Sequence, residues 1–418
     1  MTWRGWFRLC LALCGVAALT VVKPGYTQER PIADADRQIL VMLKMAPPHY
    51  RPGGSYGGSY GDTTAMAARR RLAAGIARRN GLKLVDGWPM PLIGVDCYVM
   101  RVPDGMAIDA AIAQVSKEPG VAWSQPLQMY QARGSPAGTA LNDPLFRAEP
   151  AAAAWRLADL HRIATGRGIS IAIIDSKIDV AHPDLAGQFV ANLDFVDRST
   201  TTNATSEAHG TGVAGIVGAK EGNGIGIAGI APDARMMALR ACWQTAGGPT
   251  LCNSLGLARA LQFAIEHNAG VINLSLAGPA DPLLARLIAI AVSRNISVVA
   301  AFDPSLPQGG FPASLPGVIA VADESLQSLP ARVYGAPGRD VPTTQPGGKW
   351  YLVNGSSYAV AHVSGLIALV RQSGGRAVRI ALTRAAGGAI DACATLLGTS
   401  AACDCSCAID RRLAGGRR

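Results

Sequence analysis

The sequence predicts an α/β protein in which a parallel sheet carries helices on both faces, preceded by a small α+β unit. After residue 142, short apolar runs alternate with helical stretches, as buried parallel strands alternate with crossover helices. Between residues 31 and 130 the elements follow the order β-α-β-β-α-β of ferredoxin-like units. The chain has 418 residues, 49% of them hydrophobic and 16% charged, which excludes a wholly disordered protein and leaves room for two or three domains.

The start of the chain has the pattern of an export signal. Two arginines, Arg4 and Arg8, precede the apolar run Leu9–Val22, which is shorter than the roughly 20 residues needed to span a bilayer. We therefore expect a signal peptide at residues 1–28 and a mature protein that is secreted or periplasmic, without a stable membrane anchor.

The small unit is expected at residues 31–130. Its elements are expected, in order, as strand Gln38–Met45, helix Thr63–Asn80, two strands within Leu82–Val102, helix Ala107–Glu118 and strand Val121–Tyr130. The first helix is rich in alanine and arginine and ends at Gly81, a residue type that often closes helices. Residues 131–141 are small and polar, which predicts an exposed linker and a cleavage point.

The net charge is +10, and most of the excess lies in the first third of the chain. Residues 1–141 contain 16 Lys and Arg against 9 Asp and Glu, whereas residues 142–418 contain 23 against 20. The larger part is therefore nearly neutral, and a basic face on one helix is typical of a solvated surface. No nucleic-acid partner is expected.

The larger unit is expected at residues 142–370. Its strands are expected at Ile169–Ile174, Met236–Arg240, Val271–Leu276, Ile296–Ala301 and Val318–Ala322, and its helices at Gly210–Gly218, Leu255–Asn268 and Pro282–Arg294. The apolar runs are short and bounded by turn residues, which favours strands buried on both faces over helices.

Nine cysteines occur in the chain, and six of them follow residue 141. Cys242 and Cys252 flank a loop containing Gly-Gly-Pro, and export favours their pairing as a disulfide. The other four lie in a Cys-rich extension at residues 371–418: Cys393, Cys403, Cys405 and Cys407. The C-x-C-x-C spacing differs from the C-x2-C of zinc sites, so disulfides of undetermined pairing are favoured there over a metal site.

Three polar residues stand where chemistry is expected. Asp175 ends the strand ISIAIID, His209 opens a glycine-rich helix, and Ser357 stands at the start of a long apolar helix. Each alone is typical of ordinary turns and helix ends. Their order along the chain, with spacings of 34 and 148 residues, is that of an Asp-His-Ser nucleophilic triad.

Residues 142–370 resemble the catalytic domain of the subtilases, the subtilisin-like serine peptidases. The resemblance is carried by IIDSKIDVAHPDL, HGTGVAGIVGA and NGSSYAVAHVSG, in that order, and by GNGIGIAGIAPDARMMALR and VINLSLAGP. Residues 31–130 resemble the inhibitory propeptide of the same family. The resemblance implies a subtilisin-like fold, a zymogen inhibited by its own propeptide, and peptide or protein substrates.

The resemblance also implies a role for each site residue. His209 takes the proton of Ser357, which attacks the substrate carbonyl, and Asp175 orients and stabilises the imidazole. The helix that begins at Ser357 directs its N-terminal dipole at the developing oxyanion. The strand edge that pairs with an extended peptide substrate is implied at Ser275, Leu276 and Ala277.

The sequence departs from the family pattern at the oxyanion position. Asp303 stands where the family normally has the Asn that donates the second oxyanion hydrogen bond. An ionised carboxylate only accepts hydrogen bonds, whereas a protonated carboxyl can donate one. Loss of the Asn donor costs about 10²–10³ in rate in subtilisin. Other departures near the motifs are Lys177, Gly212, Ala277, Ser356 and Ala361.

No cofactor or catalytic metal is expected, because triad chemistry needs neither. Asp184 and Asn223 fall where some subtilases bind a structural calcium. The alternative for these two residues is a surface carboxylate and a turn asparagine, and both interpretations stay open at this point.

The leading hypothesis is an exported, monomeric serine endopeptidase made as a zymogen and processed between Gln128 and Leu141. An alternative is a catalytically impaired subtilase-fold protein that binds peptides or partners, which Asp303 favours and the intact triad disfavours. An esterase of the α/β-hydrolase class is disfavoured, because Ser357 lies in G-S-S-Y-A and not in G-x-S-x-G.

Overall fold

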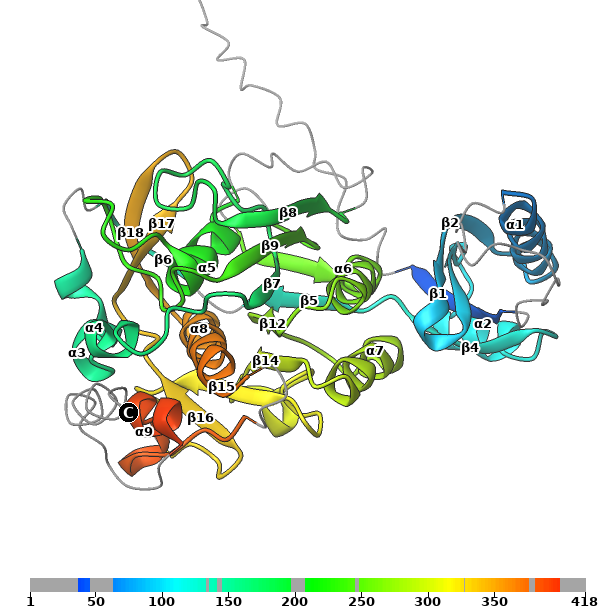
Figure 1. Ribbon diagram of the computed structural model, residues 1–418. Helices are drawn as coiled ribbons and strands as arrows, with labels where there is room; N and C mark the ends of the chain where they lie inside the picture. Colours follow the sequence, from blue (N-terminus) through cyan, green and yellow to red (C-terminus); the bar gives the residue numbers. More distant parts are fainter. Residues whose placement is uncertain are drawn as a thin grey trace, which may run out of the picture.

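The computed structural model describes residues 37–45, 63–132, 135–140, 145–196, 207–244, 248–326, 328–375 and 380–398. They form a small N-terminal unit, blue to cyan in Figure 1, beside a larger α/β unit coloured from green to red. The export signal expected at residues 1–28 lies outside the described residues, as do Cys403, Cys405 and Cys407.

The N-terminal unit is a four-stranded antiparallel sheet with two helices. Its elements are β1 (Gln38–Lys44), α1 (Thr63–Arg79), β2 (Lys83–Met90), the 3-10 turn η2 (Pro91–Ile93), β3 (Val95–Arg101), α2 (Ile108–Val115) and β4 (Val121–Pro126). The strand order β2-β3-β1-β4 with antiparallel neighbours is the ferredoxin-like arrangement expected from the sequence.

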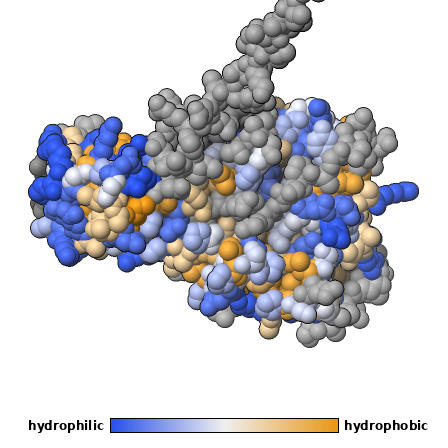
Figure 2. All heavy atoms as spheres, turned by 180° about the vertical axis from the view of Figure 1, so that it is seen from behind, coloured by the Kyte–Doolittle hydropathy of each residue, from blue (hydrophilic) through white to orange (hydrophobic). Residues whose placement is uncertain are grey.

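The arginine-rich face of α1 is a solvated surface. Arg70 and Arg71 are exposed, and Arg69 pairs with the buried Asp96 at 2.8 Å. Figure 2 views the molecule from behind, and hydrophilic residues dominate the surface of this unit there.

The larger unit contains a seven-stranded sheet in which all neighbouring strands are parallel. In order along the sheet, the strands are β16 (Val333–Ala336), β15 (Ile319–Asp323), β14 (Ser297–Ala301), β12 (Val271–Leu274), β7 (Ser170–Asp175), β9 (Arg235–Arg240) and β8 (Phe189–Asp194). The α/β fold class is therefore confirmed.

Helices cover both faces of this sheet (Figure 1). On one face lie α5 (His209–Gly218) and α8 (Ser356–Gly374), and on the other α6 (Ser254–Glu266) and α7 (Pro282–Ser293). Shorter elements are η3 (Phe146–Ala148), α3 (Pro150–Ala154), α4 (Leu157–His161), η4 (Pro307–Gly309), η5 (Ala386–Gly388) and α9 (Ala392–Leu397). Cys393 and Leu396 of α9 belong to the core cluster of α8, so this core continues past the boundary expected at residue 370.

The N-terminal sheet docks on α6 and α7, so that β1 is buried on both faces. Ile39 and Val41 lie in the core cluster of α1 and α2, whereas Leu40 and Met42 lie in the cluster that contains α6 and α7. This alternation is the period of two expected of a strand. Asp281, the N-cap of α7, also accepts a hydrogen bond from Gln125 Nε2 of β4 at 2.7 Å.

Two strands expected as continuous are divided, and the new pieces meet in a second sheet. The strand expected at Val121–Tyr130 ends with β4, and β5 (Met129–Ala132) follows it. The strand expected at Val271–Leu276 ends with β12, and β13 (Leu276–Ala277) follows it. With β10 (Cys242–Gln244) and β11 (Thr250–Asn253), these pieces form the antiparallel sheet β10-β11-β5-β13.

The exposed linker expected at residues 131–141 is largely paired backbone. Its first residues belong to β5, and β6 (Ser135–Ala140) pairs with β18 (Lys349–Asn354), which pairs in turn with β17 (Val341–Gln345). Small, polar side chains do not prevent the backbone of this segment from pairing with a neighbouring strand. The pairing satisfies its N–H and C=O groups. The segment expected as a linker therefore contains paired strands, and the cleavage point expected within it stays a prediction.

The disulfide expected between Cys242 and Cys252 is present. Cys393 is also disulfide-bonded, and Cys97 is a buried free thiol. Within the part of the chain that the structure describes, no helix has both the length and the apolar composition to cross a membrane.

Candidate active site

Asp175 and His209 form a buried hydrogen-bonded pair. Asp175 is the last residue of β7 and His209 the first of α5, and their side chains are 2% and 4% exposed. His209 Nδ1 lies 2.8 Å from Asp175 Oδ1, which also accepts the Ser176 N–H at 2.7 Å. With Nδ1 facing the carboxylate, Nε2 is the nitrogen left to take a proton. Nε2 has no hydrogen-bond partner among the described residues.

A glycine after the histidine allows this close approach. Gly210 N donates to Ser176 Oγ at 3.0 Å. A Cβ at Gly210 would lie 2.5 Å from the Ser176 carbonyl oxygen, closer than real Cβ atoms approach, and 3.2 Å from Ile178 Cγ1. The Gly-rich motif around His209 therefore serves the contact between α5 and the end of β7.

Ser357 is the second residue of α8 and is fully buried. Its hydroxyl donates to the Ser275 carbonyl at 2.8 Å, and the Ser275 hydroxyl lies 2.9 Å from the Ser357 carbonyl oxygen. The hydroxyl of Ser357 is thus directed to Ser275 and not to His209 Nε2. A hydrogen bond from a catalytic serine to its base often forms only when substrate is bound.

Tyr358 is a site residue that the sequence reasoning missed. Its ring is buried, and its centroid lies 5.5 Å from that of His209. A Cβ at Gly212 would lie 3.3 Å from Tyr358 Cε1 and 3.1 Å from Thr343 Cγ2. The absence of a side chain at Gly212, where the family usually has a His, therefore makes room for the tyrosine. Burial, with a further contribution from Asp175, raises the pKa of Tyr358, so its phenol stays neutral.

Asp303 lies in the turn after β14 and is buried. Its Oδ1 accepts the Ser305 N–H at 2.9 Å and the Ser305 hydroxyl at 2.7 Å. Its own N–H donates to the Gly309 carbonyl at 3.0 Å. These contacts hold Oδ1 of Asp303 as an acceptor within the turn that follows β14.

The residues expected to pair with substrate pair instead with the chain's own strand β5. Leu276 lies opposite Ala132, and Ala277 opposite Gln131. On its other side β5 pairs with β11, where Leu251 lies opposite Gln131. Ala132 thus lies opposite the residue that follows Ser275, whose carbonyl accepts the Ser357 hydroxyl. A segment of this chain thus occupies the position expected for a bound peptide.

The surroundings of Asp184 do not fit a calcium ion. Asp184 is fully buried, and its Oδ1 accepts from Asn223 Nδ2 at 2.7 Å. Its Oδ2 accepts from the Ile227 N–H at 3.0 Å and from Trp350 Nε1 at 2.8 Å. Calcium takes oxygen ligands, whereas these partners present N–H groups. A Cβ at Gly226 would overlap both Asp184 Oδ2 and the Trp350 indole, so the space beside the carboxylate is filled.

A second buried carboxyl, Glu149, lies in the same region. Its Oε1 accepts the Ala228 N–H at 2.9 Å. Burial raises the pKa of Glu149 to about 8, with a further contribution from Asp184. Glu149 is therefore protonated at neutral pH.

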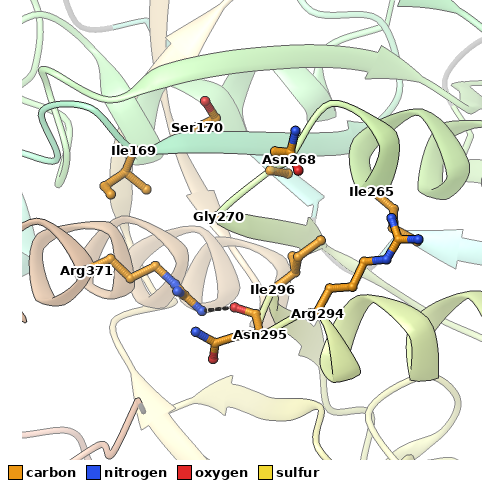
Figure 3. A pocket seen from close by; sticks show the side chains of 10 residues that line it. Ile169, Ser170, Ile265, Asn268, Gly270, Arg294, Asn295, Ile296 and Arg371 are labelled. Carbon is orange, nitrogen blue, oxygen red and sulfur yellow. Dashed lines mark hydrogen bonds between the residues drawn. The ribbon is translucent and has the colours of Figure 1, made fainter. Parts of the chain in front are cut away.

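A separate pocket lies at the amino ends of the main-sheet strands, away from the end at which Asp175 lies (Figure 3). It is lined at the amino ends of β7, β12 and β14 by Ser170, Gly270 and Ile296. Arg371 of α8 reaches it and donates to the Asn295 carbonyl at 2.5 Å, beyond the end of α7. A cation is favourable at the carbonyl end of a helix. Because Asp175 lies at the carboxyl end of β7, this pocket is separate from the Asp175–His209 pair.

The comparisons with known proteins agree with the fold. The model of the subtilase family matches residues 166–398. Subtilisin NAT of Bacillus subtilis subsp. natto is 36% identical over 220 residues, which cover 49% of this chain and 56% of that protein. Thermitase of Thermoactinomyces vulgaris is 32% identical over 256 residues, which cover 57% of this chain and 88% of that protein.

Among solved structures, fervidolysin of Fervidobacterium pennivorans, described as a keratinolytic enzyme related to subtilisin, superposes with a TM-score of 0.60. The two are 22% identical, and the match covers 80% of this chain and 54% of that one. The chain belongs to the subtilase family. It spans a little over half the length of subtilisin NAT, and the family match runs to residue 398, past the expected boundary at residue 370.

Proposed function

We propose that this protein is a serine endopeptidase in which Ser357 is the nucleophile, His209 the general base and Asp175 the residue that orients the histidine. The observation that carries the proposal is the buried Asp175–His209 pair, with Tyr358, the neighbour of Ser357, packed against the imidazole. Membership of the subtilase family supports the same reaction.

The proposed reaction starts when the Ser357 hydroxyl exchanges its bond to the Ser275 carbonyl for one to His209 Nε2. His209 takes the proton as Ser357 Oγ attacks the peptide carbonyl, and Asp175 stabilises the imidazolium. The imidazolium then gives its proton to the leaving amine. A water molecule, deprotonated by His209, hydrolyses the acyl ester and regenerates the Ser357 hydroxyl.

The protein is further proposed to be made as a zymogen, inhibited by its own N-terminal unit. The support is β5, which follows that unit and pairs on both sides with β11 and β13. We place the proposed processing site after Ala132, inside the range between Gln128 and Leu141 predicted from the sequence; the pairing of Ala132 with Leu276 supports this.

The remaining assignments rest on the sequence. The basic and apolar start of the chain supports export to the periplasm or the medium. Peptides or proteins are the proposed substrates, and the proposed mature form is a monomer without nucleic-acid partner or membrane anchor.

Labelling by a fluorophosphonate probe tests the proposal. Purified full-length chain should process itself and then acquire the probe on Ser357, as mapped by mass spectrometry. The Ser357→Ala variant should remain unprocessed and unlabelled. Identical cleavage of both variants in a purified system would refute self-processing, and failure of the processed wild type to react would refute the nucleophile.

A catalytically impaired, peptide-binding protein is the second candidate. It is favoured by the Asp303 carboxyl, whose Oδ1 accepts two hydrogen bonds from Ser305, because a carboxylate near the oxyanion would repel it. A processed chain that binds peptides with ordinary affinity and leaves Ser357 unlabelled would establish this candidate.

A further inference from the structure

The disulfide joins β11, the strand that pairs with β5, to β10, the next strand of the same sheet. Cys242 and Cys252 stand opposite each other in the β10–β11 ribbon, and both are buried. Cys252 also lies opposite Tyr130 of β5. One half of the disulfide is therefore in the strand that contacts the bound segment, and the other half is one strand further away.

The two halves differ in how firmly they are anchored. One residue, Ala241, separates Cys242 from the end of β9, and its N–H donates to the Asp175 carbonyl at 2.9 Å. β10 is thereby fixed to the strand that carries the triad acid. β11 begins after the hairpin loop and is fixed at its far end by Asn253, the N-cap of α6, which accepts the Gly256 N–H at 2.8 Å.

Removal of β5 leaves β11 with little support. While β5 is in place, β11 is an inner strand with a partner on each side. Without β5, three residue pairs with β10 remain, and a two-stranded ribbon is only marginally stable by itself. The disulfide, at the end of the ribbon away from the hairpin loop, then supplies a covalent link between β10 and β11.

We propose that the Cys242–Cys252 disulfide holds β11 as one flank of the peptide-binding position, and so sets the affinity for extended peptides. Cys242 and Cys252 are positioning residues in this assignment: they touch neither the nucleophile nor the base. The inference rests on the proposed function for its substrate, and on strand pairing alone for its structural part. Ordering β11 in advance removes an entropy cost that each bound peptide would otherwise meet.

The first test uses the full chain and needs no activity. In a Ser357→Ala background, which prevents self-cleavage, amide hydrogen exchange is measured with and without Cys242→Ser and Cys252→Ser. We expect amides of β5 and β11 to exchange about tenfold faster when the disulfide is removed, while those of β7 are unchanged. Each single variant should match the double variant, because either one breaks the bond.

The second test uses the processed chain. Removing the disulfide should raise KM about tenfold for a peptide with four residues before the scissile bond. KM for a short ester that does not reach β11 should stay the same, and so should kcat for both substrates. A merely structural role would lower the melting temperature without this difference between substrates.

A relocated disulfide provides the matched control. Gln244 and Thr250 stand opposite each other two positions along the same ribbon, on the same face as the native pair. Gln244→Cys with Thr250→Cys, in the chain lacking the native disulfide, should restore slow exchange and the KM ratio between long and short substrates. The ratio corrects for any effect of losing the Gln244 contact with the Ala208 N–H.

Three results would overturn the inference: unchanged exchange in β5 and β11, equal acceleration in β7, or equal changes of KM for long and short substrates. If Ser357 takes no probe in the wild type, the proposed peptidase function fails, yet the exchange experiment still decides whether the disulfide supports β11.

Discussion

The two halves of the candidate site are built from equivalent places in the sheet and end in different states. Asp175 closes β7 and reaches across to α5, where it meets the imidazole of His209 at 2.8 Å. Asp303 follows β14 and accepts from Ser305, two residues further along the chain. On that side Ser357 donates to Ser275. Both carboxyl groups are buried, so the difference lies in their partners: one is held by a distant segment and the other by its own turn.

The comparison teaches that the half with Asp175 and His209 already has its two side chains in contact, whereas Ser357 and Asp303 of the other half are each bonded to other residues. The family pattern is kept at Asp175 and His209, and the contact made there needs a glycine at 210 and a long-range approach. At Asp303 the family pattern is broken, and a nearby serine supplies donors. The predictions below test whether both halves nevertheless act as one site.

Removing either half of the triad should have the largest effect. Ser357→Ala and His209→Ala are each expected to lower kcat by about 10⁶, as deletion of the equivalent groups does in subtilisin. The double variant should lose no more than either single one, because the two residues act as a unit. Peptide hydrolysis measures this, with circular dichroism to establish folding. A single variant that retained a tenth of wild-type activity would show that Ser357 and His209 do not act as a unit.

Asp303→Asn should strengthen the weaker half. An amide keeps an oxygen for the Ser305 donors and adds an N–H for the oxyanion, so the rate is expected to rise by up to about 10²–10³. Peptide-hydrolysis rates of the wild type and the variant measure it. Asp303→Ala is the control: it removes the carboxyl without adding a donor, so an equal gain in both variants would attribute the effect to loss of the carboxyl alone.

Glu149 is a buried carboxyl outside both halves, and its titration should affect stability alone. Its pKa in the folded chain, about 8, lies above its ordinary value of 4.5. The folded state therefore holds the proton more tightly, and this stabilisation, complete below pH 4.5, is lost as pH rises through 8. Each unit of pKa is worth about 1.4 kcal/mol, so the effect is on the order of a few kcal/mol.

Glu149→Gln should remove this pH dependence, because the amide keeps an acceptor for the Ala228 N–H and carries no proton. Unfolding by denaturant should show the variant more stable than the wild type above pH 8, with the two converging in acid. The exposed Asp109→Asn serves as a control that leaves the wild-type profile unchanged. Parallel profiles for Glu149→Gln and the wild type would contradict a buried, proton-holding Glu149.

The two halves touch where Tyr358 of α8 packs against His209 of α5, and Gly212 provides the space. Gly212→Ala is expected to destabilise the chain by roughly 1–3 kcal/mol, because the added methyl meets Tyr358 and Thr343. Tyr358→Leu should reduce that cost in a double-mutant cycle. Gly75→Ala in α1, whose added methyl would make only an ordinary contact with Arg79, is the matched control and should not destabilise. Additive changes would mean that Gly212 and Tyr358 are independent.

Asp184 should give the smallest effect. Because its partners are N–H groups, the effect of a chelator on the melting temperature should be the same in the wild type and in Asp184→Asn. Trp350→Phe removes one donor and should cost about 1–3 kcal/mol. In Trp88→Phe, where the buried indole N–H has no partner among the described residues, the cost should be smaller. A chelator effect that Asp184→Asn abolishes would place a calcium ion at this carboxylate.

The sequence by itself determined the alternation of strands and helices around β7, β9, β12, β14 and β15, the α/β class and the family. Buried parallel strands such as β7 and β14 are short apolar runs between turn residues, and this pattern is local. It also determined that Asp175, His209 and Ser357 occur in triad order, and that Cys242 and Cys252 pair. These features depend on neighbours in sequence or on motifs whose residues stand together.

The tertiary structure decided which side chains meet. It divided the strand expected at Val121–Tyr130, because Leu127 N donates to Gln38 and the following residues pair with β11 and β13. It directed the Trp350 indole to Asp184, 166 residues away, and Tyr358 into the space at Gly212. A hydroxyl, an indole or a carboxyl can accept several partners of similar energy, and only the packing of distant segments determines which of them is within reach.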